Sequence, residues 1–156
     1  MGKSMQILKY SALIALWGMS AAAATKAEIE KDCSMKNKTI SISVKGGKSF
    51  RATLADNSSS RALIKLLEKS DITIEMQDYA NMEKVGPLES RLPRNDEQIE
   101  TSCGDLILYQ GKYFAIYYAP NSWNLTRLGK IENVAEAELK EALGEGGVRV
   151  TLSIDK

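Results

Sequence analysis

The chain has 156 residues, no histidine, and 21 basic against 20 acidic side chains, so its formal charge is +1. This length suffices for one domain with a real core. The balanced charge argues against nucleic acid as a partner, because nucleic-acid binding domains usually carry a basic excess on one face. The absence of histidine excludes Ser-His-Asp and Cys-His catalysis. Two cysteines cannot supply a zinc site, and we expect no metal and no cofactor.

Residues 1–24 have the layout of a secretory signal peptide. Lys3 and Lys9 precede an uncharged stretch, Tyr10 to Thr25, that is rich in Ala, Leu and Ile and ends in small residues. The stretch is 16 residues long, shorter than the roughly 20 apolar residues of a membrane span. We therefore expect cleavage at or near Ala24, no membrane association afterwards, and a periplasmic or secreted protein. A buried N-terminal helix is the alternative.

Residues 25–38 are charged and polar without a sustained period, and we interpret them as a flexible tail before a domain that spans 39–156. Cleavage would remove two lysines and no acids, which turns the formal charge from +1 to −1. In an oxidising compartment Cys33 and Cys103 are a candidate disulfide. Two unrelated thiols are the alternative.

Apolar residues alternate along most of the domain, which predicts strands. Six or more strands with only two helices, and no alternation of strands with helices, favour an antiparallel barrel or sandwich. The expected strands are 40–44, 50–54, 72–76, 105–109, 112–118 and 148–154, with glycine turns at 46–47 and 110–111, and the expected helices are 59–68 and a segment from an Asn133 cap through Leu143.

Residues 77–103 and a second stretch after Tyr118 lack periodicity. We expect loops there, and long loops inside a compact domain are often binding loops. The candidate ligand-binding residues in them are Tyr79, Glu83, Lys84, Asn121, Trp123 and Arg127.

Two interpretations of these residues remain open. In the first, Tyr79 and Trp123 offer flat apolar surface while Lys84 and Arg127 bind an anionic or carbonyl group. In the second, Glu83, Lys84 and Arg127 pair with each other and with backbone to brace the loops, and Trp123 plugs one end of a barrel.

A series of ordered motifs runs through the chain. They are Leu54-x-Asp56-Asn57, Asp78-Tyr79, Met82-Glu83-Lys84-Val85-Gly86-Pro87-Leu88, Leu92-Pro93, Gly104-Asp105-Leu106, Leu108-Tyr109-Gln110-Gly111, Asn121-Ser122-Trp123 and Thr126-Arg127-Leu128-Gly129. Their succession resembles a small bacterial cyclophilin-like family over nearly all of the chain from Thr39 to Ile154. The resemblance implies a mostly β fold, a closed antiparallel β-barrel with two short helices.

The resemblance also bears on the function that we expect. We expect an exported binding module, not an enzyme, that holds a small molecule or peptide segment between the 79–87 and 121–127 loops. The alternative is a divergent peptidyl-prolyl cis-trans isomerase in which Arg127 polarises the prolyl amide. Isomerases of the cyclophilin class carry a Phe-His-Arg motif that this chain lacks. A third hypothesis is a partner-binding protein with Tyr113, Tyr117 and Tyr118 in an exposed patch.

Overall fold

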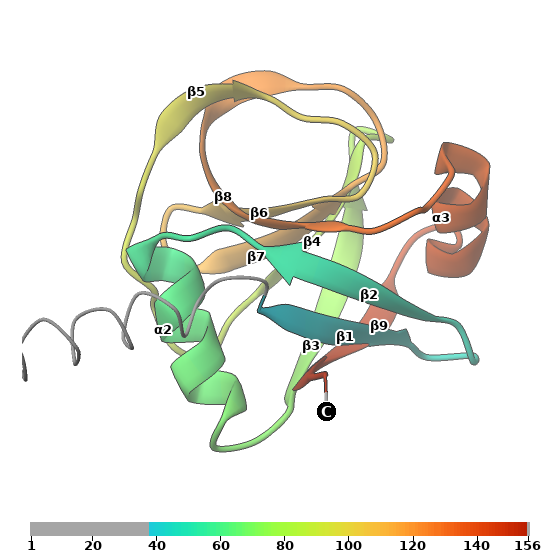
Figure 1. Cartoon of the computed structure of the whole chain (residues 1–156). Helices are drawn as coiled ribbons and strands as arrows, with labels where there is room; N and C mark the ends of the chain where they lie inside the picture. The colour runs from blue at the N-terminus through green and yellow to red at the C-terminus, as the bar shows by residue number, and fades with distance from the viewer. Residues whose placement is uncertain (1–37, 156) are drawn as a thin grey trace, which may run out of the picture. The chain divides into compact units, whose positions relative to one another are not determined.

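A computed structural model describes residues 38–155, which form nine strands and two helices (Figure 1). The elements are β1 (Thr39–Val44), β2 (Ser49–Leu54), α2 (Ser58–Leu67), β3 (Ile72–Tyr79), β4 (Glu83–Pro87), β5 (Glu97–Glu100), β6 (Asp105–Tyr109), β7 (Tyr113–Tyr117), β8 (Ser122–Ile131), α3 (Glu136–Leu143) and β9 (Val148–Ile154). The predicted signal peptide, the predicted tail up to residue 37, and Cys33 lie outside the described residues. Within 38–155, no helix is long and apolar enough to cross a membrane.

Eight of the strands close into an antiparallel barrel. Their order is β2-β1-β9-β3-β4-β7-β6-β8, and β8 pairs back onto β2. β5 lies outside this ring and pairs with the first residues of β8 (Figure 1). The fold is therefore mostly β with a closed barrel, as expected, and it is a barrel instead of a sandwich.

The core lies inside the barrel, where alternate residues of each strand meet. Both helices contribute to it, α2 through Leu63 and Leu67 and α3 through Leu139 and Leu143, and they lie on opposite sides of the barrel in Figure 1. The Asn57 side chain accepts a hydrogen bond from the Ser60 backbone at 2.9 Å and caps α2.

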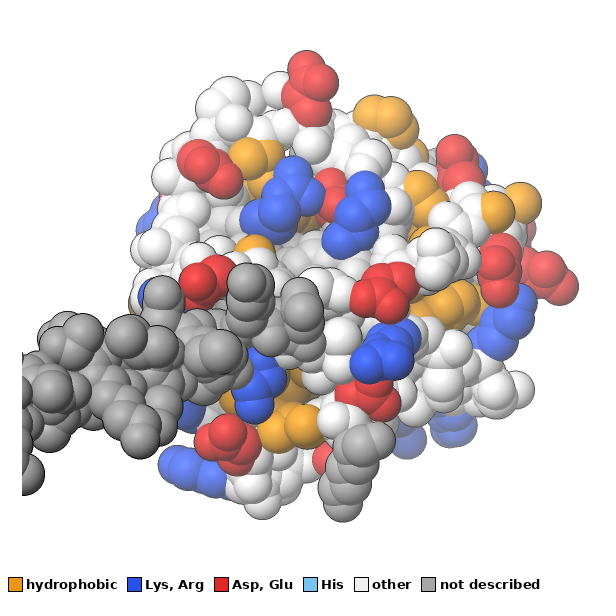
Figure 2. Space-filling model, viewed as in Figure 1, with side chains coloured by type: hydrophobic (Ala, Val, Ile, Leu, Met, Phe, Trp, Pro, Cys, Tyr) orange, Lys and Arg blue, Asp and Glu red, His pale blue; other side chains and the backbone are white. Residues whose placement is uncertain are grey.

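Most charged side chains lie on the surface, and several are paired there. Figure 2 shows acidic and basic side chains interspersed over the face in view. Exposed pairs such as Lys48 with Glu138, at 3.2 Å, contribute little to stability. Three pairs include a buried partner, Lys84 with Asp78 and both Arg127 and Lys130 with Asp105.

The strands and helices with clear periodicity agree with the sequence to within a few residues. The 105–109 and 148–154 strands have the predicted bounds. The predicted Asn133 cap is wrong, because α3 begins at Glu136 with Ala135 at its N-cap and no capping side chain. Asn133 instead has a φ of 49°, a left-handed conformation that asparagine tolerates well in turns.

The two predicted loops contain strands. Residues 77–103 contain the end of β3, all of β4 and all of β5, and most of the second stretch is β8. Periodicity fails in β4 because its two ends look unlike a strand. It begins with charged Glu83 and Lys84, both buried, and a side chain at Gly86 would lie 2.3 Å from the Glu75 backbone oxygen.

The seam that closes the barrel also requires a glycine. Gly129 of β8 lies opposite Leu54 of β2, and a Cβ there would lie 2.3 Å from the Thr53 backbone oxygen.

We predict that Gly129→Ala lowers the free energy of unfolding by about 2 kcal/mol, the usual range for overpacking. The matched control is Gly147→Ala, whose Cβ would meet only the Gln77 side chain. Urea unfolding measures both, and equal losses would contradict the prediction.

Candidate functional site

Successive side chains of β4 point to opposite faces of the barrel wall. Lys84 lies opposite Ile116, which belongs to the barrel core. Glu83 lies opposite Tyr117, which belongs to a second apolar cluster on the outer face. Two residues adjacent in sequence are therefore separated by the barrel wall.

The second cluster makes the outer face of β6 and β7 apolar. Ile107, Ala115, Tyr117 and Leu125 are buried in it, and Met82, Val85 and Ile99 pack at its edges. Ile99 comes from β5, so β5 covers part of this face. The rest of the face is left open as a groove.

We call this open part the aromatic groove. Its volume is about 600 Å³, within the usual range for ligand sites. The side chains that line it come from the β3–β4 hairpin, the β6–β7 hairpin, and β8 with the residue before it. They are Tyr79, Met82, Glu83, Val85, Tyr109, Gln110, Tyr113, Tyr117, Asn121, Trp123 and Leu125.

Three aromatic side chains of the groove are exposed. Tyr79 and Trp123 are each 59% exposed and Tyr109 is 36% exposed. Among the described residues these are all of the large hydrophobic side chains that are exposed, and all three line the same groove. Flat apolar surface gathered in one concave place is typical of a binding site.

A small polar network also lines the groove. Glu83 is only 9% exposed, and burial raises the pKa of its carboxyl although the Tyr117 hydroxyl donates a hydrogen bond to it. Burial, with the Glu83 carboxylate as hydrogen-bond partner, raises the pKa of Tyr117. The Asn121 amide donates to the Tyr117 oxygen at 3.3 Å. The buried Thr101 holds the backbone of Asn121 in place, because the Thr101 hydroxyl accepts a hydrogen bond from the Asn121 N–H at 2.8 Å.

Four of the six predicted residues therefore come together. Tyr79, Glu83, Asn121 and Trp123 line the groove. The expectation that Trp123 plugs a barrel end is wrong, because its side chain is largely exposed.

Lys84 does not line the groove. It is 1% exposed, its ammonium lies 3.2 Å from the Asp78 carboxylate, and it donates to the Gly146 carbonyl at 2.8 Å. The strand alternation of β4 turns it inward. The expectation that Lys84 lies beside Tyr79 and Trp123 to bind an anion is wrong.

Arg127 is engaged elsewhere as well. Its guanidinium lies 2.8 Å from the buried Asp105 carboxylate, with the Lys130 ammonium 3.5 Å from the same oxygen. Arg127 is not among the lining residues of the groove. The predicted pairing of Glu83 with Lys84 and Arg127 is also wrong, since each cation pairs with its own aspartate. The predicted contact with backbone is confirmed for Lys84.

Three groove tyrosines were not predicted as ligand-binding residues. Tyr109, Tyr113 and Tyr117 stand at alternating positions around the 110–111 turn, which places them on one face. That spacing in the sequence was the signal that could have identified these tyrosines as neighbours on one face. The prediction of an exposed patch formed by Tyr113, Tyr117 and Tyr118 is wrong, because Tyr117 and Tyr118 are buried.

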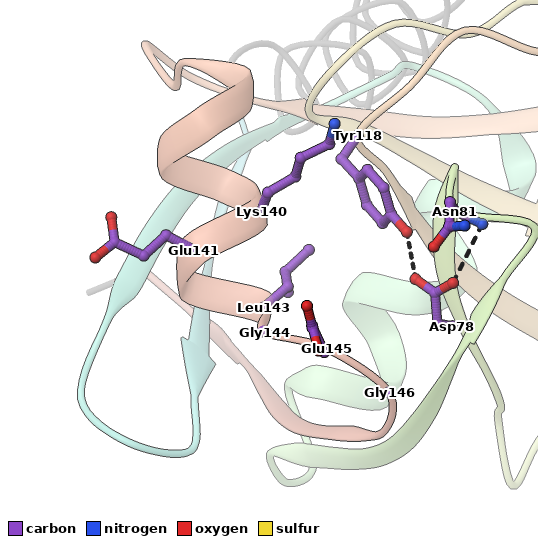
Figure 3. Close-up of a pocket in the computed structure, with 9 residues that line it drawn as sticks. All are labelled: Asp78, Asn81, Tyr118, Lys140, Glu141, Leu143, Gly144, Glu145 and Gly146. Carbon is purple, nitrogen blue, oxygen red and sulfur yellow. Dashed lines mark hydrogen bonds between the residues drawn. The ribbon is translucent and has the colours of Figure 1, made fainter.

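A second cavity, of about 680 Å³, lies beside the end of α3 (Figure 3). We call it the α3 cavity, and it is lined by Asp78, Asn81, Tyr118, Lys140, Glu141, Leu143, Gly144, Glu145 and Gly146. Partial burial alone would raise the pKa of Asp78, but hydrogen bonds from Tyr118 and Lys84 hold it below its usual range. The charge of Asp78 is therefore already compensated. This arrangement braces the β3–β4 turn and leaves the aromatic groove as the stronger candidate site.

Cys103 lies half-buried against the barrel core. Burial raises the pKa of its thiol, and the negative charge of Glu136 adds to the effect. Cys33 is outside the described residues, so the disulfide stays a prediction. Within 38–155, no three His, Cys, Asp or Glu side chains are grouped as a metal ion would require.

Comparison with known proteins identifies relatives by family and by fold. A family model described as the cyclophilin-like family matches residues 43–154, and no curated protein matches the chain. The fold is similar to the solution structure of the hypothetical protein AF2241 from Archaeoglobus fulgidus, with a TM-score of 0.52 and 12% identity over 76% of this chain and 95% of that one. It is also similar to McbB in complex with tryptophan, with a TM-score of 0.51 and 15% identity. That match covers 74% of this chain and only 44% of McbB.

Glu83 provides a test of the polar network. Burial raises its pKa, so the folded state disfavours the ionised form. Its contribution to stability is present below the pKa of the unfolded chain and is lost as pH rises through the folded pKa. We predict that Glu83→Gln raises the free energy of unfolding at about pH 7 and that this gain vanishes toward about pH 3.5.

Urea unfolding at both pH values checks this sign. The control is Glu89→Gln, which removes an exposed carboxylate and should change stability little at either pH. A Glu83→Gln variant that is less stable than the parent at neutral pH would contradict the prediction.

Proposed function

The chain belongs to the cyclophilin-like family, and we propose that it is a binding module that holds a small molecule or peptide segment in the aromatic groove. The observation that carries this proposal is the gathering of Tyr79, Tyr109 and Trp123 in one groove. Exposed aromatic side chains leave apolar surface in contact with water, which is unfavourable until a ligand covers that surface. The buried polar network of Glu83, Tyr117 and Asn121 supplies the few oriented polar groups that a ligand site needs.

Isomerase activity is less well supported. Lowering the barrier to prolyl rotation, about 18–20 kcal/mol, needs a donor aimed at the prolyl nitrogen. Arg127 was the candidate, and its guanidinium is held by Asp105 at 2.8 Å. None of the lining residues of the groove is Arg or Lys. We therefore propose binding instead of catalysis.

We also propose that the protein acts outside the cytoplasm, in the periplasm or the medium. This part rests on the signal-peptide pattern of residues 1–24. N-terminal sequencing of the chain recovered from an expressing bacterial culture tests it. A start at or near residue 25 in the periplasmic or medium fraction is expected, and a chain recovered only from the cytoplasm with residue 1 intact would overturn the proposal.

Calorimetric titration with a small panel tests the binding site. Because a similar structure holds tryptophan, the panel includes tryptophan and indole beside proline-containing peptides. We predict that Trp123→Ala and Tyr79→Ala each lower the affinity for the compound that binds by about fivefold to tenfold, since each removes one aromatic contact.

The matched control is Lys140→Ala, which alters the α3 cavity and not the groove. It should leave the affinity unchanged. Loss of binding in Lys140→Ala with none in Trp123→Ala would move the site to the other cavity. Failure of every compound to bind would remove the proposal.

A further inference from the structure

The aromatic groove contains one charged side chain. Of its lining residues only Glu83 is ionisable near neutral pH, and none is basic. The two cations that the sequence suggested for binding an anion do not line the groove. Lys84 pairs with Asp78, and Arg127 pairs with Asp105. The groove therefore has the charge of a single carboxylate.

That carboxylate lacks a cationic partner within the described residues. Its hydrogen-bond partner is the neutral Tyr117 hydroxyl, and the charge that acts on it, Asp78, has the same sign. A buried carboxylate is normally paired with a cation or a metal ion. Glu83 is 9% exposed and lines the groove, so the position facing it inside the groove is open to a ligand.

The aromatic rings favour the same charge. The faces of Tyr and Trp rings carry negative potential and attract organic cations, and cages of such rings bind quaternary ammonium groups. Tyr79, Tyr113 and Trp123 line the same groove as the Glu83 carboxylate, and Tyr79 lies directly opposite Glu83 in the β3–β4 pairing. The Tyr113 ring already attracts one cation in the folded chain, because the Lys112 ammonium lies 5.6 Å from its centroid.

From these two observations we infer that the aromatic groove selects ligands that carry an organic cation, with the ammonium or guanidinium facing Glu83. The inference rests on the proposed binding function and narrows it to a ligand class. It reverses the expectation of an anionic or carbonyl ligand. The groove volume of about 600 Å³ leaves room for a larger apolar part of the ligand beside the cationic group.

Three probes of matched shape and different charge test this inference. They are choline, its uncharged isostere 3,3-dimethylbutan-1-ol, and the isosteric anion 3,3-dimethylbutanoate. Titration of the purified protein, followed by NMR shifts of groove residues, measures each affinity. We expect choline to bind about tenfold more tightly than the alcohol, and the anion to bind most weakly.

Two variants assign the preference to the carboxylate. In Glu83→Gln, choline and the alcohol should bind equally, because the charge is gone while the shape is kept. Glu89→Gln, an exposed carboxylate outside the groove, should keep the full preference. The folded state of each variant is checked by its NMR spectrum before titration.

The outcomes separate the inference from the proposed function. If all three probes bind the groove with equal affinity, or the anion binds best, the cation inference is wrong while the binding function stands. If none of the probes shifts any groove residue, the cation inference is wrong, and the binding function is then decided by the panel of tryptophan, indole and proline-containing peptides. A choline preference that survives in Glu83→Gln would overturn the role given to Glu83.

Discussion

Closure of the barrel is the constraint on which the rest of this structure depends. Once β8 pairs back onto β2, every strand of the eight-stranded ring has one face in the core and one face outside. Neighbouring side chains in a strand must then separate. Glu83 and Lys84 are the clearest case, because one is placed in the groove and the other in the barrel core.

The same alternation explains why a groove forms at all. The outer faces of β6 and β7 are apolar, and the short β5 strand covers only part of them. The remaining surface is bordered by Tyr79 and Trp123, which stay exposed. Burying Glu83 there carries a desolvation cost that a cationic ligand would offset. A site with an unpaired buried carboxylate is thus less stable alone and better suited to binding.

The sequence predicted the fold well because the fold depends on local patterns. The 105–109 and 148–154 strands and the glycine turn at 110–111 follow from alternation and turn chemistry. The family resemblance supplied the closed barrel, which no local pattern specifies. Prediction failed at β4, since its buried charges and Gly86 respond to contacts from β3 and from the more distant β7, which the local pattern does not show.

The candidate site was predicted in part for a similar reason. Tyr79 and Trp123 were found because isolated aromatic residues in polar stretches stand out. The partners of Lys84 and Arg127 were not, because Gly146 and Asp105 come near only in the folded chain. Charge type alone suggested an anion site, whereas the pairing of those charges leaves a groove with one acid.

The most direct test of this claim is NMR titration of the Glu83 carboxyl carbon, with and without choline. We predict a pKa above that of an ordinary glutamate in the free protein, because the carboxyl is buried without a cation. Binding of choline should then lower it, since the cation favours the ionised form. An ordinary pKa that choline leaves unchanged would contradict a cation site at Glu83.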